Sequence, residues 1–408
     1  MPYTQNVAFP NETGQTLAGR LHLPRGPFRG AALFAHCFTC SKDIAAAKRI
    51  AESLSRSGLA VLRFDFTGLA QSEGDFAQTS FHTNLSDLKA AASFMSGQSF
   101  GLHNLAPQLL IGHSLGGAVV LAAAPEIASV TGIATIGAPA EPAHVLHLVK
   151  QDVDTILAAG RAEVNIGGRP FQIGAEFVTD LQTCLSTDHI KRLSCDLLIL
   201  HAPRDAIVGI DNAAAIFTAA KHPKSFISLD RADHLLSKTE DSQFAADMIS
   251  AWARRCLGEP VKATRASEGE VDVNTSSDGD FAQDILAGEH NLRADEPVSV
   301  PGGLNTDPAP YDFLLAGLGA CTAMTLKMYA RRKSWPLEDV EVQLSHAKIH
   351  QQDTLAASRL DQMSRQIKLT GPLDDAQRAQ LMQIADKCPV HKTLEAGVQI
   401  QTTQTSRS

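Results

Sequence analysis

Short apolar runs recur along about the first 255 residues, and segments with helical spacing lie between them. The runs are residues 31–35, 59–64, 109–111, 133–136, 197–200 and 226–229. Strands that read as unbroken apolar runs and alternate with helices are typical of a parallel sheet with helices on both faces. The first part of the chain is therefore predicted to be α/β.

The length of 408 residues exceeds what one ordinary core holds, so two domains are expected. The stretch 138–191 interrupts the rhythm of strands and is helical in places, so we expect a small helical cap over an active site. A polar stretch with breakers, 258–265, is the expected linker between a domain at 1–257 and a domain at 266–408. Alternating segments and a long helical run, 310–332, predict an α+β second domain.

Composition narrows the class of protein. Hydrophobic residues make up 44% and charged residues 20%, which indicates a globular chain. The net charge of −8 gives no basic surface for nucleic acid and no polybasic stretch for an anionic membrane. The N-terminus does not read as a signal peptide, and the apolar stretch 109–130 is too interrupted to cross a membrane. The seven cysteines are few and scattered, which favours a reducing, cytoplasmic location over a disulfide framework.

A turn of the pattern G-x-S-x-G, Gly112–Gly116, stands between the run 109–111 and a helical segment. Such a turn holds its serine on a sharp bend at the C-terminal edge of a sheet, and small residues let the bend close. We therefore expect Ser114 to be a nucleophile. The alternative is an inert serine in an ordinary strand-to-helix turn.

A serine hydroxyl needs a base, and the base needs a carboxylate to orient it. The expected order along a chain of this type is serine, acid, histidine. Asp205 and His234 each lie just past the end of an apolar run, where catalytic residues collect. Asp211 and Asp233 are alternative acids. Asp233 adjoins the histidine and would point away from it, so Asp205 is the preferred partner of His234.

The oxyanion hole is expected to use the main-chain amide of Leu115, the residue after the nucleophile. A second amide should come from the loop after residues 31–35, and Phe38 is the candidate because of its position. Cys37 and Cys40 flank it as C-x-x-C. Two free, packed thiols are favoured there over a redox switch.

The nucleophile turn, followed by Asp205 and His234, resembles the α/β-hydrolase superfamily over about residues 1–257. The resemblance implies esterase, thioesterase or related acyl chemistry on a substrate that the cap selects. Cys37 stands where many members of the superfamily have glycine.

Two cysteines near the C-terminal end, Cys321 and Cys388, suggest a second chemistry. Cys321 lies in an apolar helical segment rich in small residues, and Cys388 directly precedes Pro389. A thiol that attacks peroxide needs a second thiol within reach to form a disulfide. Since only the fold could bring the two together, spacing alone would favour two buried structural cysteines.

The local sequences are more specific than the spacing. The segments 310–315 (PYDFLL), 319–321 (GAC) and 388–391 (CPVH) resemble the OsmC and organic-hydroperoxide-resistance superfamily, over about residues 266–401. The resemblance implies an α+β fold built as an intertwined homodimer. It also implies reduction of organic hydroperoxides by a dithiol reductant, without metal or haem.

In that resemblance Cys321 is the peroxidatic cysteine and Cys388 the resolving one. The better-known peroxidase branches have a glutamate where Tyr311 stands, and Asp312 comes next. They also polarise the thiolate with an arginine, for which Arg293 is the candidate.

Two alternatives for the second domain stay open. Cys388, His391 and Cys321 could be metal ligands. The domain could also be a dimerisation or redox-regulatory module without peroxidase activity.

The whole chain resembles the bifunctional α/β-hydrolase/OsmC family, of which 36–42 (HCFTCSK) and 63–68 (RFDFTG) look like signatures. We therefore expect a serine hydrolase of small acyl esters, fused to a cysteine pair that reduces organic hydroperoxides with a dithiol and no bound cofactor.

Overall fold

The computed structural model describes residues 4–24, 28–100, 103–166, 169–184, 187–257, 269–276, 279–288, 290–350 and 359–404. The chain folds as two units. The first comprises Met1–Glu270 with Leu286–Asn291, and the second comprises Val271–Ile285 with Leu292–Ser408. The expected linker, 258–265, lies outside the described residues.

An eight-stranded sheet of the order β1-β2-β4-β3-β7-β8-β11-β12 forms the first unit. The strands are β1 (Thr4–Pro10), β2 (Thr16–His22), β3 (Gly30–Ala35), β4 (Leu59–Phe64), β7 (Leu109–His113), β8 (Gly132–Ile136), β11 (Asp196–His201) and β12 (Lys224–Ser228). β1, β2 and β4 pair antiparallel, whereas the pairs from β4 to β12 are parallel. Apart from Leu229, the six predicted apolar runs lie in the parallel strands, which confirms the α/β fold class.

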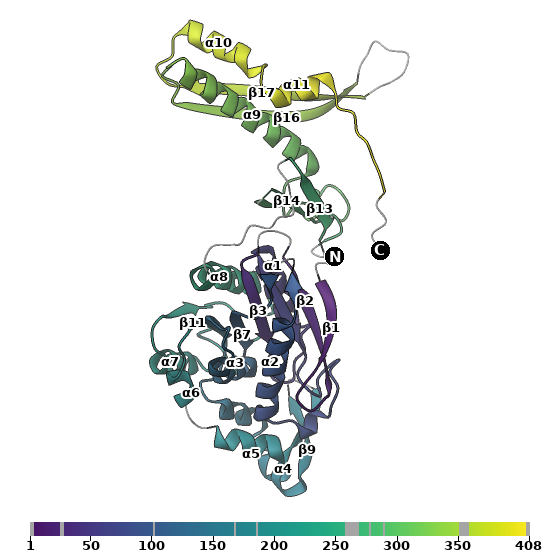
Figure 1. Cartoon of the computed structure of the whole chain (residues 1–408), viewed down its shortest axis with the longest axis vertical. Coiled ribbons are helices and arrows are strands. Elements are labelled where there is room, and N and C mark those ends of the chain that lie inside the picture. The colour runs from purple at the N-terminus through teal and green to yellow at the C-terminus, as the bar shows by residue number, and fades with distance from the viewer. Residues whose placement is uncertain are drawn as a thin grey trace. The chain divides into compact units, whose positions relative to one another are not determined.

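Helices cover both faces of this sheet (Figure 1). One face is packed by α1 (Ala45–Arg56) and α8 (Thr239–Leu257). The other is packed by α2 (Phe81–Ser96), α3 (Leu115–Ala123) and α7 (Asp211–Ala219). Two apolar cores result, and the C-terminal edge of the parallel strands is left for polar side chains.

Alternation along β3 explains the two cores. Ala32 and Phe34 pack with Ile50 of α1, whereas Leu33 packs with Leu88 of α2. Successive strand side chains point to opposite faces, so an apolar residue at every position serves both cores. Burying one leucine-sized side chain contributes about 2 kcal/mol.

The cap prediction needs correction. Between β8 and β11 the chain forms helices but also an antiparallel hairpin, so the cap is mixed rather than helical. Its elements are η3 (Pro142–Val149), α4 (Val153–Ala159), β9 (Arg161–Ile166), β10 (Arg169–Gly174), α5 (Ala175–Thr183) and α6 (Asp188–Lys191). Val164 and Ile173 are the buried residues that anchor the hairpin. Residues 161–166 alternate polar and apolar side chains, a local strand signal that the expectation of a helical cap did not take into account.

Among its described residues, the second unit contains most of two small sheets and three helices. Strands β13 (Val271–Thr275), β14 (Gln283–Ala287) and β15 (His290–Ala294) form one sheet, and β16 (Asp339–His350) pairs antiparallel with β17 (Arg359–Thr370). The helices are α9 (Pro310–Arg332), α10 (Asp375–Ala385) and α11 (Pro389–Ala396). Helix α9 packs along the β16–β17 ribbon and against α10 (Figure 1).

Much of the surface of α9 is apolar and exposed. Met324 is 64% exposed and Met328 is 72% exposed. Among the described helices, α9 is the one whose length and composition would allow it to cross a membrane. That likeness is weak, because the core helix of a soluble protein can have the same length and composition.

Candidate active site

The nucleophile turn sits between β7 and α3 of the first unit. Ser114 has φ +55°, a left-handed conformation that a serine adopts only when its surroundings enforce it. There is no room for a side chain at Gly112 or Gly116, which lie two residues before and after it. A Cβ on Gly112 would lie 2.3 Å from the carbonyl oxygen of Gly116, and a Cβ on Gly116 would lie 2.4 Å from that of Ala35. The bend therefore closes tightly against the end of β3.

His234 lies between Ser114 and Asp205. Its Nε2 is 2.9 Å from the Ser114 Oγ, and its Nδ1 is 2.7 Å from the Asp205 Oδ2. A carboxylate can only accept here, so Nδ1 carries the proton and Nε2 has a lone pair facing the serine hydroxyl. The three residues come from the ends of β7, β11 and β12, which meet at one edge of the sheet.

Asp205 is held as a carboxylate. Burial alone would raise its pKa, but the hydrogen bond to His234 and those from the amides of Val208 and Ile207 outweigh it, so the pKa is lowered. The other carboxylate oxygen, Oδ1, accepts both amides at 2.9 Å. The acid is therefore ionised and fixed in direction before any substrate binds.

The alternative acids point elsewhere. Asp233 accepts the main-chain N–H of Ser237 at 2.8 Å, and Asp211 begins helix α7. The structure thus brings Asp205, and not its two rivals, to the histidine.

The 36–42 loop follows β3 and lies against the nucleophile turn. Leu115 is the first residue of α3, so its N–H has no acceptor within the helix. Within the described part of the chain, the Phe38 N–H also donates to no acceptor. Both amides are therefore available to an oxygen at this site.

The expectation of two free thiols in this loop is wrong. Cys37 and Cys40 form a disulfide, with their Cα atoms 5.4 Å apart. The Cys40 N–H donates to the Cys37 carbonyl, and Thr39 has φ +58°, so a tight turn brings the two cysteines into bonding range. The C-x-x-C spacing carried the signal, but the turn that closes it is visible only in the structure.

Phenylalanines join the 36–42 loop to the cap. Phe38 stacks on Phe177 of α5 with ring centroids 5.1 Å apart. Phe76 lies 5.7 Å from Phe38 and 5.9 Å from Phe171 of β10. We call these four residues the aromatic wall. They give the site an apolar side between the loop and the cap.

Because two of its histidines are buried, we expect the first unit to become less stable at low pH. Burial, followed by the charge of Arg63, lowers the pKa of His22 to about 3, and burial, followed by His234, lowers that of His113 to about 4. Both stay neutral when folded, whereas an unfolded chain binds protons on them below 6.5. The contribution of these two histidines to the free energy of unfolding is therefore fully present above pH 6.5 and is lost as the pH falls toward 4. At pH 5 the loss is about 2 kcal/mol per imidazole.

The urea midpoint of the first unit, followed by hydrogen exchange, should be lower at about pH 5 than at about pH 7.5. His113→Gln should weaken this dependence, and His82→Gln, at an exposed position of α2, should retain it. A midpoint that stays constant over this range would contradict the explanation.

The second unit brings Cys321 and Cys388 together. Cys388 is the N-cap of α11, and its Sγ accepts the His391 N–H at 3.3 Å. Burial tends to raise the pKa of Cys388, but hydrogen bonds from His391, Thr322 and Cys321 and the charge of Arg365 lower it overall. Cys388 is fully buried, whereas Cys321 is partly exposed.

Arg365 is a residue that the sequence did not reveal. It donates to the Thr322 Oγ1 at 2.7 Å and to the Asp386 Oδ1 at 2.7 Å. Arg293, the residue expected to polarise the thiolate, lies 3.4 Å from the carboxylate of Asp307. An arginine in an alternating strand has no local signal that links it to a cysteine on a helix.

The other residues that the sequence analysis named in the second domain make contacts within that domain. Tyr311 stacks on His346 at 4.2 Å, and Asp312 accepts the Ala309 N–H at 2.9 Å, which caps α9. His391 lies 3.5 Å from Glu395. Within the described ranges, no three His, Cys, Asp or Glu side chains are placed to hold a metal ion.

Two protein families match the chain, one in the first unit and one in the second. Residues 28–159 match the family described as serine aminopeptidase, S33, and residues 303–403 match the OsmC-like protein family. No curated protein matches the chain.

Similar solved structures cover the first unit. The esterase domain of a Rhodothermus marinus protein is 47% identical with a TM-score of 0.51, and the match covers 63% of this chain and 100% of that one. Est1E from Butyrivibrio proteoclasticus, with ferulic acid bound, is 17% identical with a TM-score of 0.50, over 62% and 100% of the two chains. Mouse alpha/beta hydrolase domain-containing protein 10 is 21% identical with a TM-score of 0.50, over 62% and 99%. The last two share the fold alone. With its hydrolase match and its 47% identity to an esterase domain, the chain belongs to the α/β-hydrolase family and carries a C-terminal OsmC-like domain.

Proposed function

We propose that the first unit hydrolyses carboxylic esters with Ser114 as nucleophile, His234 as base and Asp205 as the acid that orients it. The observation that carries the proposal is the line of two hydrogen bonds, 2.9 Å and 2.7 Å, from the Ser114 Oγ through His234 to Asp205. His234 takes the serine proton as the oxygen attacks the carbonyl carbon, then delivers it to the leaving alcohol. Water repeats the sequence on the acyl-enzyme and releases the acid.

The amides of Phe38 and Leu115 are the proposed oxyanion hole, so we call the 36–42 loop the oxyanion loop. Donors already in place stabilise the charge on the tetrahedral intermediate without reorganisation. The aromatic wall favours an ester with a small apolar acyl group or alcohol. A p-nitrophenyl butyrate assay on the purified chain tests the proposal.

Asp205→Asn should lower kcat by about 10⁴-fold with little change in KM, because the neutral amide no longer selects the correct tautomer of His234. Steady-state kinetics on p-nitrophenyl butyrate measure the effect. Asp211→Asn and Asp233→Asn are the matched controls and should retain nearly full activity. A strong loss in either control, with Asp205→Asn still active, would reassign the acid.

We further propose that the second unit reduces organic hydroperoxides with Cys321 and Cys388. The supporting observations are that Cys321, among other neighbours, lowers the pKa of Cys388, and that Cys388 is buried whereas Cys321 is partly exposed. The partly exposed sulfur of Cys321 gives up its proton and attacks the peroxide oxygen, the O–O bond breaks, and the departing alkoxide takes up a proton and leaves as an alcohol. The Cys388 thiolate then attacks the sulfenic sulfur of Cys321, the S–O bond breaks, and the hydroxide leaves as water after taking up a proton. A dithiol reduces the resulting disulfide.

A homodimer through the second unit is part of this proposal. Its described residues bury a small apolar core around α9 and α10, whereas large apolar side chains stay exposed. Large apolar side chains exposed along one helix, such as Met324 and Met328 of α9, commonly belong to a protein interface. The alternative function, a dimerisation or redox-regulatory module without peroxidase activity, predicts the same dimer and no turnover of hydroperoxide.

A further inference from the structure

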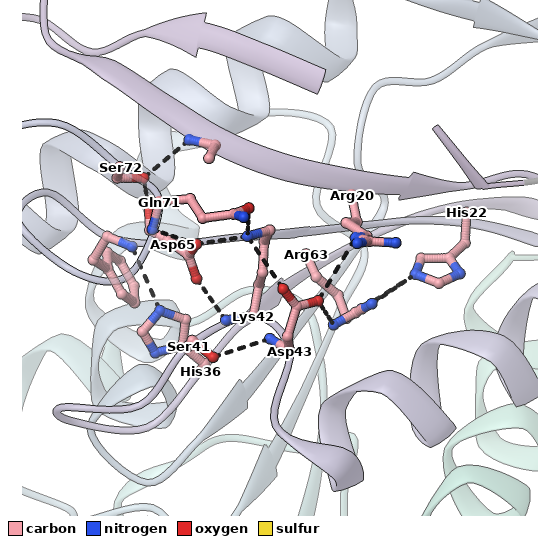
Figure 2. Close-up of polar contacts among 12 residues, drawn as sticks. Arg20, His22, His36, Ser41, Lys42, Asp43, Arg63, Asp65, Gln71 and Ser72 are labelled. Atoms are coloured by element: carbon pink, nitrogen blue, oxygen red, sulfur yellow. Dashed lines mark hydrogen bonds and ion pairs between the residues drawn. The ribbon is translucent and has the colours of Figure 1, made fainter. Parts of the chain in front are cut away.

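A salt bridge between Lys42 and Asp65 is enclosed at the end of the oxyanion loop (Figure 2). The Lys42 side chain is 1% exposed and that of Asp65 is 0% exposed. The Lys42 Nζ lies 2.7 Å from the Asp65 Oδ2, and the Lys42 main-chain N–H donates to the Asp65 Oδ1 at 2.6 Å. The carboxylate therefore fixes both the main chain and the side chain of Lys42.

Burying two charges is costly, and a buried pair is weak evidence for stability, because apolar residues of similar volume often serve as well. Apolar side chains, however, could not orient the main chain and the side chain of Lys42 as the Asp65 carboxylate does. The Asp65 Oδ2 also accepts the Gln71 N–H at 3.3 Å, so the carboxylate has a defined orientation from three donors. This geometry favours a role in placing the loop over a role in stabilising the fold.

Further polar contacts connect Lys42 to two strands of the sheet. The Lys42 Nζ lies 3.4 Å from the Asp43 carboxylate, and Asp43 lies 3.5 Å from Arg63 of β4. Arg63 donates to the His22 Nε2 of β2 at 3.2 Å, as Figure 2 shows. Because burial keeps His22 neutral, its ring nitrogen can accept this bond. The end of the oxyanion loop is thus tied to two strands.

The start of the loop is held by the residue next to Asp65. The Phe66 N–H donates to the His36 Nε2 at 3.4 Å, so the His36 proton is on Nδ1, which donates to the Cys37 carbonyl at 2.8 Å. The Cys40 N–H donates to the same carbonyl at 3.2 Å. Since the peptide is planar and trans, holding this carbonyl sets the opposite direction of the Phe38 N–H.

We infer that Lys42 and Asp65 are positioning residues that hold the oxyanion loop, and with it the Phe38 N–H, in place for the ester oxygen. Asp65 anchors the end of the loop, and the adjacent Phe66 anchors its start through His36. The inference rests on the proposed esterase function. Neither residue touches the substrate, and their effect is expected on the transition state rather than on substrate binding.

The test compares Lys42→Met, the paired variant Lys42→Met/Asp65→Asn, and the control Lys48→Met. Lys42→Met alone leaves a buried carboxylate without its cation and can unfold, whereas the paired variant removes both charges at similar volume. Lys48 lies on α1, half exposed and 3.9 Å from Glu52, so it tests loss of a lysine without loss of the anchor. Gln71→Met is a milder variant that removes one acceptor of the Lys42 ammonium.

For each folded variant, kcat and KM on p-nitrophenyl butyrate are measured together with inhibition by a trifluoromethyl ketone, which forms a tetrahedral adduct. We expect the paired variant to lose about 100-fold in kcat and in affinity for the ketone, with KM nearly unchanged. Gln71→Met should show a smaller loss of the same kind, and Lys48→Met none.

A folded paired variant with wild-type kcat would overturn the inference. If the paired variant does not fold, wild-type kcat and ketone affinity in Gln71→Met would overturn it instead. Failure of the proposed function looks different, because the wild-type chain would then hydrolyse no ester and bind no ketone.

Discussion

Ser114→Ala is expected to lower kcat for ester hydrolysis by about 10⁶-fold, to a residual rate that the remaining site supports. The substitution removes the atom that forms the acyl-enzyme, while His234 and Asp205 keep their contact. The methyl group fits the space of the hydroxyl, so the fold should be unaffected. Steady-state hydrolysis of p-nitrophenyl butyrate measures the loss.

Ser129→Ala is the matched control. Its hydroxyl donates to the Pro107 carbonyl at 2.7 Å, remote in sequence from the nucleophile turn. The control should hydrolyse the ester at the wild-type rate. Wild-type hydrolysis by Ser114→Ala would show that another residue is the nucleophile.

Cys321→Ser should stop turnover of an organic hydroperoxide, because no thiol remains to attack the O–O bond. Before dithiothreitol is added, Cys388→Ser should consume one hydroperoxide per chain and then stop, because the sulfenic acid on Cys321 has no resolving thiol within the chain. Consumption of cumene hydroperoxide with dithiothreitol measures turnover, and peptide mass spectrometry locates the oxidised sulfur. Both variants should hydrolyse esters normally.

Cysteines of the first unit provide the controls. Burial raises the pKa of Cys195 to about 11 and that of Cys256 to about 12, so both stay protonated and unreactive near neutral pH. Their serine variants should consume hydroperoxide at the wild-type rate. A wild-type chain that forms dimers but consumes no hydroperoxide would favour the dimerisation or regulatory module.

The parallel strands could be predicted from the sequence because both faces of such a sheet are buried. Residues 59–64, for example, are apolar at nearly every position and all lie buried in β4. Ser114, Asp205 and His234 followed from the same pattern, because each stands in the loop or turn that follows a strand. Their local positions therefore carried enough information to bring them to one edge.

Other features depend on contacts that no local pattern records. Lys42 and Asp65 are 23 residues apart, and Arg365 is 43 residues from Thr322. A buried lysine looks in sequence like any exposed one. The Cys37–Cys40 disulfide was missed because it depends on a tight turn whose direction the tertiary fold decides. The hairpin of the cap was missed although residues 161–166 alternate polar and apolar.

The central claim is that Ser114 is an activated nucleophile, and covalent labelling tests it most directly. The intact chain is treated with a fluorophosphonate, and the adduct is located by peptide mass spectrometry. We predict one adduct per chain, on Ser114, absent from Ser114→Ala and formed much more slowly in Asp205→Asn. An adduct on another serine, or none on a folded chain, would contradict the account.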